Sequence, residues 1–215
     1  NAVVHRQNLD RLPEMIALAE RLECRRIEVA TVQFHGWADL NRKPLMPTME
    51  QAARAREVVN AARARLRGRM VIDYVPADHH ALYPKSCMGG WGSTGLNIAP
   101  DGTVLPCHAA QTIKSLRFDN IREAPLARIW HDSPAFNAFR GTAWLPEPCQ
   151  SCDRREVDFG GCRCQAMAMA GDPMATDPVC TRSPLNARLR AEAEADAASD
   201  DTALVYRRMS RDGRS

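Results

Sequence analysis

Seven of the eight cysteines lie between Pro84 and Pro184, in sequence rich in glycine and proline. They include one C-x-x-C and one C-x-C spacing, and thiols at this density are expected to bind a metal or a cluster. An odd number of thiols cannot all pair as disulfides, and a single tetrahedral zinc site would leave several of them idle. Iron–sulfur clusters therefore fit this segment best. The seven are Cys87, Cys107, Cys149, Cys152, Cys162, Cys164 and Cys180.

Two sites with four ligands each need one ligand more than these thiols supply. The remaining cysteine, Cys24, lies far upstream between a helical pattern and a strand pattern, where a buried apolar thiol is the expected role. A carboxylate inside the cysteine-rich segment is the better candidate for the eighth ligand.

The spacing within the segment is distinctive. Fourteen residues separate Cys87 from Gly102, and four separate that glycine from Cys107. Further on, Cys149 opens a block that reads C-x2-C-x5-D-x3-C, with one more cysteine at the end of the segment. These blocks resemble the SPASM domain, which carries auxiliary clusters in many radical S-adenosylmethionine (SAM) enzymes that modify peptides. The family has a third cysteine in the second block where Asp158 stands here, so the resemblance implies that Asp158 is the eighth ligand.

The family pattern, carried over position by position, implies two ligand sets. In SPASM domains the first block shares a cluster with the last cysteine of the second block, and the remaining ligands hold the other cluster. The first set then lacks one ligand, which Cys164 is placed to supply. The implied cofactors are one 4Fe-4S cluster and one cluster that is either 2Fe-2S or 4Fe-4S. The first set is Cys87, Cys107, Cys162 and Cys164, and the second set is Cys149, Cys152, Asp158 and Cys180.

Four stretches around the cysteines narrow the resemblance. They are residues 85–92 (KSCMGGWG), 104–110 (VLPCHAA), 133–141 (SPAFNAFRG) and 152–164 (CDRREVDFGGCRC). They resemble the PqqA peptide cyclases of pyrroloquinoline quinone (PQQ) biosynthesis, and the resemblance extends over residues 8–180. It implies a radical SAM oxidoreductase that joins a Glu and a Tyr side chain of the precursor peptide PqqA through a carbon–carbon bond. The implied partners are that peptide, the small peptide chaperone PqqD and a flavodoxin- or ferredoxin-like electron donor.

One family motif is missing. Radical SAM enzymes hold their catalytic cluster with a C-x3-C-x2-C motif, and no such spacing occurs in these 215 residues. The chain also opens on Asn1, in the middle of a repeating α/β pattern. We therefore expect a piece of a larger enzyme that is inactive alone, with SAM and the catalytic 4Fe-4S cluster bound in the missing N-terminal part.

The first third of the chain must position this segment. Periodicity predicts a helix over residues 9–22 with a cap at Asn8 or Asp10, a largely buried strand over 27–34, a helix over 48–66 and a strand over 70–75. The spacing Thr48-x-x-Gln51 is a capping box that opens the second helix. Crossovers of this length imply parallel strands. The fold class is α/β, and the resemblance implies the C-terminal part of a partial (β/α)6 radical SAM barrel.

Polar and aromatic residues follow the first of these strands. They are His35, Trp37 and Asn41. Barrel enzymes place their chemistry at the C-terminal ends of strands, so contact with SAM or substrate is one interpretation. A packed loop is the equally weighted alternative.

Residue 77 marks a shift in composition. Residues 96–105 read as a hairpin around a Pro-Asp-Gly turn, residues 124–139 as a helix interrupted near Ser133, and the stretch after Pro184 as a helix to Ala198 with a frayed tail. The expected domains are residues 1–76 for the barrel units, 77–183 for a small irregular α+β SPASM domain with two clusters, and 184–215 for a C-terminal helix and flexible tail.

Composition limits the classes of partner. The net charge of +3 is too small to indicate nucleic acid or an anionic membrane, and no apolar stretch is long enough to span a bilayer. With 45% hydrophobic residues and thiols at cluster-binding spacing, the sequence indicates a cytoplasmic, cofactor-binding chain.

Two rival functions stay open. Another SPASM enzyme, one that forms thioethers or matures sulfatases, would keep the clusters and change the substrate. A zinc-ribbon binding module without catalysis would use Cys149, Cys152, Cys162 and Cys164 and leave three cysteines idle.

Overall fold

The computed structural model describes residues 1–34 and 36–206. The chain divides into two compact units. One contains residues 1–81 and the described residues from Arg190 onward, and the other is Leu82–Leu189. The predicted site residue His35 lies outside the described residues.

A three-stranded parallel sheet forms the centre of the first unit. Its strands stand in the order β1 (Ala2–Val4), β2 (Arg26–Thr31) and β3 (Val71–Val75). In the register of β2 with β3, Ile27 lies opposite Ile72 and Val29 opposite Tyr74. The parallel pairing predicted from the crossover lengths is confirmed. Strand β1 was not predicted, because three residues are too few for a period-2 pattern to show.

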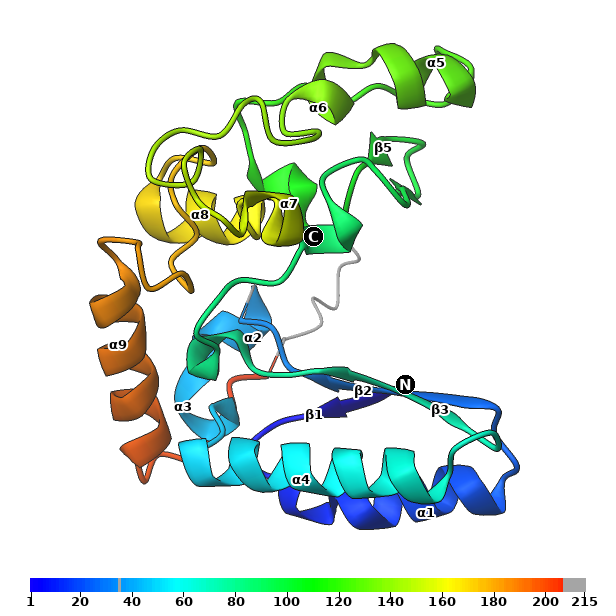
Figure 1. The fold of residues 1–215 in the computed structure, drawn as a ribbon, viewed down its shortest axis with the longest axis vertical. Coiled ribbons are helices and arrows are strands. Elements are labelled where there is room, and N and C mark those ends of the chain that lie inside the picture. The colour runs from blue at the N-terminus through cyan, green and yellow to red at the C-terminus, as the bar shows by residue number, and fades with distance from the viewer. Residues whose placement is uncertain (35, 207–215) are drawn as a thin grey trace, which may run out of the picture. The chain divides into compact units, whose positions relative to one another are not determined.

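Two helices cover one face of this sheet, as Figure 1 shows. They are α1 (Leu12–Arg21), preceded by a 3-10 turn at Leu9–Arg11, and α4 (Met49–Arg65). Strand β2 alternates accordingly, with Ile27 and Val29 buried in the core of this unit and Glu28 exposed. The prediction of a largely buried strand was therefore too broad, since the covering helices lie on one side only.

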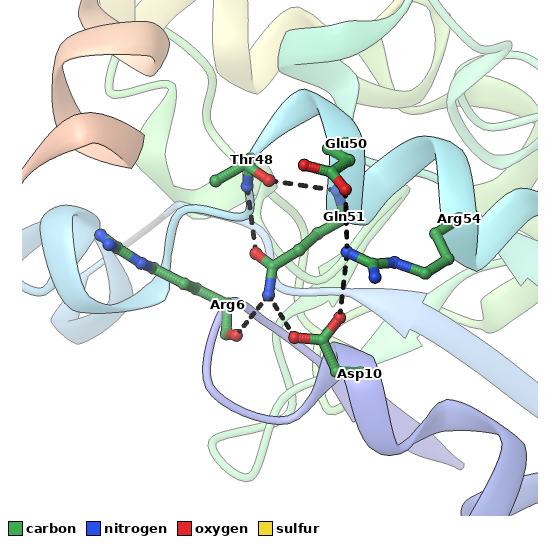
Figure 2. A network of polar contacts seen from close by, with 6 residues as sticks. All are labelled: Arg6, Asp10, Thr48, Glu50, Gln51 and Arg54. Atoms are coloured by element: carbon green, nitrogen blue, oxygen red, sulfur yellow. Dashed lines mark hydrogen bonds and ion pairs between the residues drawn. The ribbon is translucent and has the colours of Figure 1, made fainter.

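The N-terminus of α4 is fixed by its side chains (Figure 2). Thr48 Oγ1 accepts a hydrogen bond from the Gln51 backbone N–H at 3.1 Å, and Gln51 Oε1 accepts one from the Thr48 N–H at 3.2 Å. The predicted capping box is thus confirmed, and such a cap stabilises a helix by about 1 kcal/mol. Gln51 Nε2 also donates to the Arg6 carbonyl oxygen at 3.0 Å and to Asp10 Oδ2 at 2.9 Å. The same glutamine therefore ties the loop after β1 to α4.

The cap predicted for α1 was wrong. Helix α1 follows Arg11 without a side-chain cap. Asn8 instead accepts a hydrogen bond from the His5 backbone N–H at 2.8 Å and donates to the Val3 carbonyl oxygen at 3.1 Å. Its amide stabilises the preceding loop, a competing role that short polar side chains commonly take.

Short helices and the C-terminal helix complete the first unit. They are α2 (Trp37–Leu40), α3 (Arg42–Leu45), the 3-10 turn Asp78–His80 and α9 (Asn186–Ala198), whose later residues belong here. Arg42 Nε lies 2.7 Å from Asp196 Oδ2 of α9, with its guanidinium 5.5 Å from the ring centroid of Phe34. The Val205 backbone N–H donates to Asn41 Oδ1 at 2.6 Å.

The second unit contains a hairpin. Strands β4 (Asn97–Ile98) and β5 (Val104–Leu105) pair antiparallel around the predicted Pro-Asp-Gly turn. Gly102 has a φ of +89°, and a Cβ there would lie 2.6 Å from Asn120 Oδ1. The turn therefore requires glycine at the position that the SPASM pattern reserves for it.

Short helices surround this hairpin. They are the 3-10 turns Cys87–Gly89 and Ala110–Thr112, and the helices α5 (Leu126–Asp132), α6 (Pro134–Asn137), α7 (Arg155–Asp158) and α8 (Arg163–Ala170). Ser133 is extended between α5 and α6, as the serine–proline pair predicted. Trp91 and Phe139 pack edge to face at 5.2 Å within a buried cluster that also contains Cys107 and Cys164. The thiols thus lie in the core of this unit.

None of the helices in residues 1–34 and 36–206 has the length and apolar character needed to cross a lipid bilayer.

Candidate iron–sulfur cluster sites

The first predicted ligand set comes from three separate segments of the second unit. Cys87 begins a 3-10 turn, Cys107 follows strand β5, and Cys162 and Cys164 lie at the N-terminus of α8. Met88 has a φ of +52°, so the backbone reverses directly after Cys87. Cys107 and Cys164 are buried, and the other two thiols are half-buried. The fold therefore brings together residues that are up to 77 positions apart in the sequence.

These four thiols contact one another in a closed ring. The Sγ atoms of Cys107 and Cys164 are 3.8 Å apart. The pKa of the Cys107 thiol is lowered by hydrogen bonds from Cys164 and Cys87. Hydrogen bonds from Cys164 and Cys87 also lower the pKa of Cys162, with help from backbone N–H groups at the start of α8. Hydrogen bonding to Cys107 and Cys162 raises the pKa of Cys87 and of Cys164. The thiols therefore titrate as a set, and thiolates are the form that binds metal.

The second predicted set lines a pocket in the same unit. The pocket encloses about 300 Å³ of non-protein space, part of it open to solvent. Burial raises the pKa of the Cys180 thiol, a backbone hydrogen bond from Arg182 lowers it, and the nearby Cys149, Asp158 and Cys152 raise it, so Cys180 lies close to the other three groups. The lining residues include Cys149, Cys152, Asp158, Thr176, Asp177 and Cys180.

Asp158 is the residue that departs from the family pattern. It ends α7 and is only 8% exposed. Its Oδ1 accepts a hydrogen bond from the Gly160 N–H at 3.1 Å, and its Oδ2 lies 3.6 Å from Arg154 Nε. Each carboxylate oxygen keeps further acceptor capacity toward the pocket that Asp158 lines.

A short segment with left-handed backbone conformation joins the two ligand sets. Phe159, Gly160 and Gly161 all have positive φ, between +51° and +78°. A Cβ on Gly161 would lie 2.3 Å from Asp177 Oδ2 and 2.6 Å from Pro84 Cβ, so glycine is required there. This tight turn carries the chain from Asp158 in the second set to Cys162 in the first set.

Two buried charged residues near this turn were not predicted from the sequence. Asp177 Oδ2 accepts a hydrogen bond from the Cys162 backbone N–H at 2.6 Å, and burial raises the pKa of its carboxyl to about 7. Arg163 is 2% exposed. A single arginine or aspartate in a loop is usually exposed. The only local sign of close packing in the sequence is the neighbouring Gly160-Gly161 pair.

The other predicted site residues lie in the first unit. Trp37 is 46% exposed at the start of α2. Asn41 is buried, and its amide donates to the carbonyl oxygens of Trp37 at 2.7 Å and Val205 at 3.1 Å. The contacts of Asn41 thus match the packed-loop alternative. Cys24 packs against the core of that unit, as expected for an apolar thiol.

The donor chemistry of the two sets fits iron–sulfur clusters. One set offers four thiols, and the other offers three thiols and a carboxylate around a pocket. Within the described residues, no three His, Cys, Asp or Glu side chains are arranged to hold a single metal ion. Ligands of a cluster surround several iron atoms and need not converge on one point. The arrangement also assigns Cys149 and Cys152 to one set and Cys162 and Cys164 to the other, whereas a zinc ribbon would need these four together.

Comparison with known families agrees with the class of site that this fold defines. Residues 87–153 match the SPASM family, described as an iron–sulfur cluster-binding domain. The matched residues all lie in the second unit. The fold resembles the crystal structure of SuiB from Streptococcus suis bound to S-adenosylmethionine, with a TM-score of 0.60 and 19% sequence identity. That similarity covers 84% of this chain and 44% of SuiB.

Comparison with curated sequences indicates a narrower group of similar proteins. The chain is 61% identical to the PqqA peptide cyclase of Rhizobium meliloti over 96% of its own length and 55% of the relative. It is 59% identical to the PqqA peptide cyclase of Ruegeria pomeroyi over 99% of its own length and 57% of the relative. The chain is thus a relative of the PqqA peptide cyclases over nearly all of its length. It spans about half the length of these curated relatives.

Proposed function

We propose that this chain is the auxiliary-cluster half of a radical SAM peptide cyclase that acts on the precursor peptide PqqA in PQQ biosynthesis. The observation that carries the proposal is the grouping of the ligands. Four thiols lie together at one place, and three thiols with Asp158 line a pocket at another. The names of the relatives supply the substrate.

The first cluster is assigned to Cys87, Cys107, Cys162 and Cys164, and the second to Cys149, Cys152, Asp158 and Cys180. When bound, such clusters supply one-electron transfer. The chain's own residues provide thiolates, exclude water from Cys107 and Cys164, and fix the loops in place. Because each set joins distant segments, cluster binding should also stabilise the fold of the second unit.

The remaining assignments belong to the complete enzyme. Residues 1–76 are assigned to the last units of a partial (β/α)6 barrel, 77–183 to the auxiliary domain and 184–215 to a C-terminal helix and tail. SAM and its catalytic 4Fe-4S cluster belong to a preceding part. His35, Trp37 and Asn41 are the candidates for contact with SAM or substrate. The reaction would join a Glu and a Tyr side chain, with PqqD presenting the peptide and a flavodoxin- or ferredoxin-like donor supplying electrons in the cytoplasm.

The proposal predicts that this chain binds iron and does not cleave SAM. Purified anaerobically and mixed with SAM and a strong reductant, it should be brown and form no 5′-deoxyadenosine. The full-length relative from Rhizobium meliloti serves as the positive control in the same assay. Formation of 5′-deoxyadenosine by this chain would place the radical-generating site here and contradict the division. A colourless, zinc-containing protein would favour the zinc-binding alternative.

A further inference from the structure

Arg163 extends between the two proposed ligand sets. Its backbone lies between Cys162 and Cys164 of the first set. Its Nη1 donates to the carbonyl oxygens of Pro173 at 2.8 Å and Ala175 at 2.9 Å. Ala175 directly precedes Thr176, a residue that lines the second pocket. The side chain thus connects the segment that carries the first set with the wall of the second site.

The guanidinium is held rigidly and almost without water. Arg163 is 2% exposed, its Nη2 donates to the Gly160 carbonyl oxygen, and its Cζ lies 4.9 Å from the ring centroid of Trp144. Among the described residues, its buried Nε–H has no hydrogen-bond partner. Burying a donor without an acceptor is unfavourable, because the donor loses its hydrogen bond to water. This chain therefore presents a fixed, desolvated cation with one unused donor.

Groups of both sets interact electrostatically with this cation. Burial lowers the pKa of Arg163, whereas Asp177, Cys162, Cys149 and Cys87 all raise it. Cys162 and Cys87 belong to the first set and Cys149 to the second. A buried charge is tolerated only when it is compensated nearby, and Asp177 with the ligand thiolates of bound clusters would supply that compensation.

We infer that the buried guanidinium of Arg163 raises the reduction potentials of both proposed clusters. Reduction adds a negative charge, and a fixed cation in a low-dielectric interior stabilises that charge. Hydrogen bonds to sulfur and nearby net charge are the means by which proteins set cluster potentials. The unpaired Nε–H leaves one donor that a sulfur atom of a bound cluster would satisfy. Arg163 is thus a positioning and tuning residue for both sites, an inference that rests on the proposed cluster assignments.

The test measures the potentials of both clusters in three variants of the cluster-loaded chain. Arg163→Met removes the charge and the donors at similar volume, and Arg163→Lys keeps the charge. Arg128→Gln is the matched control, because Arg128 is exposed on α5 and water screens its charge. Redox titration followed by EPR reports each cluster separately, without reliance on enzymatic activity.

In Arg163→Met, the ratio of oxidised to reduced form at a fixed applied potential should rise about tenfold for both clusters, which corresponds to ~59 mV for a one-electron couple. Arg163→Lys should change it by less than about threefold, and Arg128→Gln should leave it unchanged. If Arg163→Met keeps both clusters at the parent potentials, or moves only one of them, the inference is overturned.

If Arg163→Met loses a cluster, the Arg163→Lys variant tests whether the positive charge at this position sets the potentials. If both cluster potentials in Arg163→Lys stay near those of the parent, the inference is supported. If they fall as far as expected for Arg163→Met, it is overturned, because the lysine still carries the positive charge. Iron content of the parent is measured first. A parent without iron contradicts the proposed function, whereas a loaded parent whose potentials ignore Arg163 contradicts this inference alone.

Discussion

Replacing Cys164 with alanine should remove the first cluster and leave the second one intact. Cys164 is fully buried, and its Sγ lies 3.8 Å from that of Cys107. Without it the first set retains three thiols, and a cluster that has lost one of its ligands is easily degraded. The iron content should fall by the share of the first cluster. The EPR signal of the second cluster should remain, because its ligands come from other segments.

The matched control for this variant is Cys24→Ala. Cys24 packs against the core of the first unit and belongs to neither set, so its replacement should leave the iron content unchanged. Loss of the sulfur atom costs some packing at the half-buried Cys24 and at the buried Cys164, but only Cys164→Ala should lose iron, which separates packing from ligation. Unchanged iron in Cys164→Ala would remove Cys164 from the ligand list and leave the C-x-C spacing without a role.

Asp158→Ala should yield a depleted second cluster that lacks one iron. A carboxylate oxygen is a harder donor than a thiolate, so the iron bound by Asp158 should exchange more easily than the other irons. Asp158→Cys should therefore retain the full iron content, with an altered EPR signal and potential. Iron analysis and EPR of both variants check this prediction.

The structure suggests a sharper control for this position. Asp158 Oδ1 accepts the Gly160 N–H, so the carboxylate also stabilises the turn before Gly161. Asp158→Asn keeps an acceptor for that N–H and removes the anionic ligand. We expect the Asp158→Asn variant to lose iron as the Asp158→Ala variant does. An Asn variant with the parent's iron content, EPR spectrum and potential would mean that Asp158 only stabilises the turn.

Features with a local physical cause were predictable from the sequence. The Thr48 capping box, the Pro-Asp-Gly turn of the hairpin and the break at Ser133 each depend on residues a few positions apart. The parallel order of β2 and β3 followed from the crossover length. The grouping of the cysteines did not follow from local pattern, because Cys87 and Cys164 are 77 positions apart, and it was predicted only through the family resemblance.

Other features depend on tertiary burial, which the local sequence does not indicate. Arg163 and Asp177 are charged residues whose sequence neighbours give no reason to expect 2% exposure. Asn41 stands after a strand, where barrels place functional groups, yet its amide bonds the backbone of Val205, 164 positions later. Such contacts are made only after distant segments have met.

The central claim is that this chain holds two distinct clusters on the two ligand sets. Mössbauer spectroscopy of the anaerobically purified, iron-57-enriched chain, with iron and sulfide analysis on the same sample, tests it most directly. The account predicts two spectrally distinct clusters, one of them a 4Fe-4S cluster with one iron site that differs from the rest because Asp158 supplies oxygen. A single cluster type bound at one site, or a protein that contains zinc and no sulfide, would contradict it.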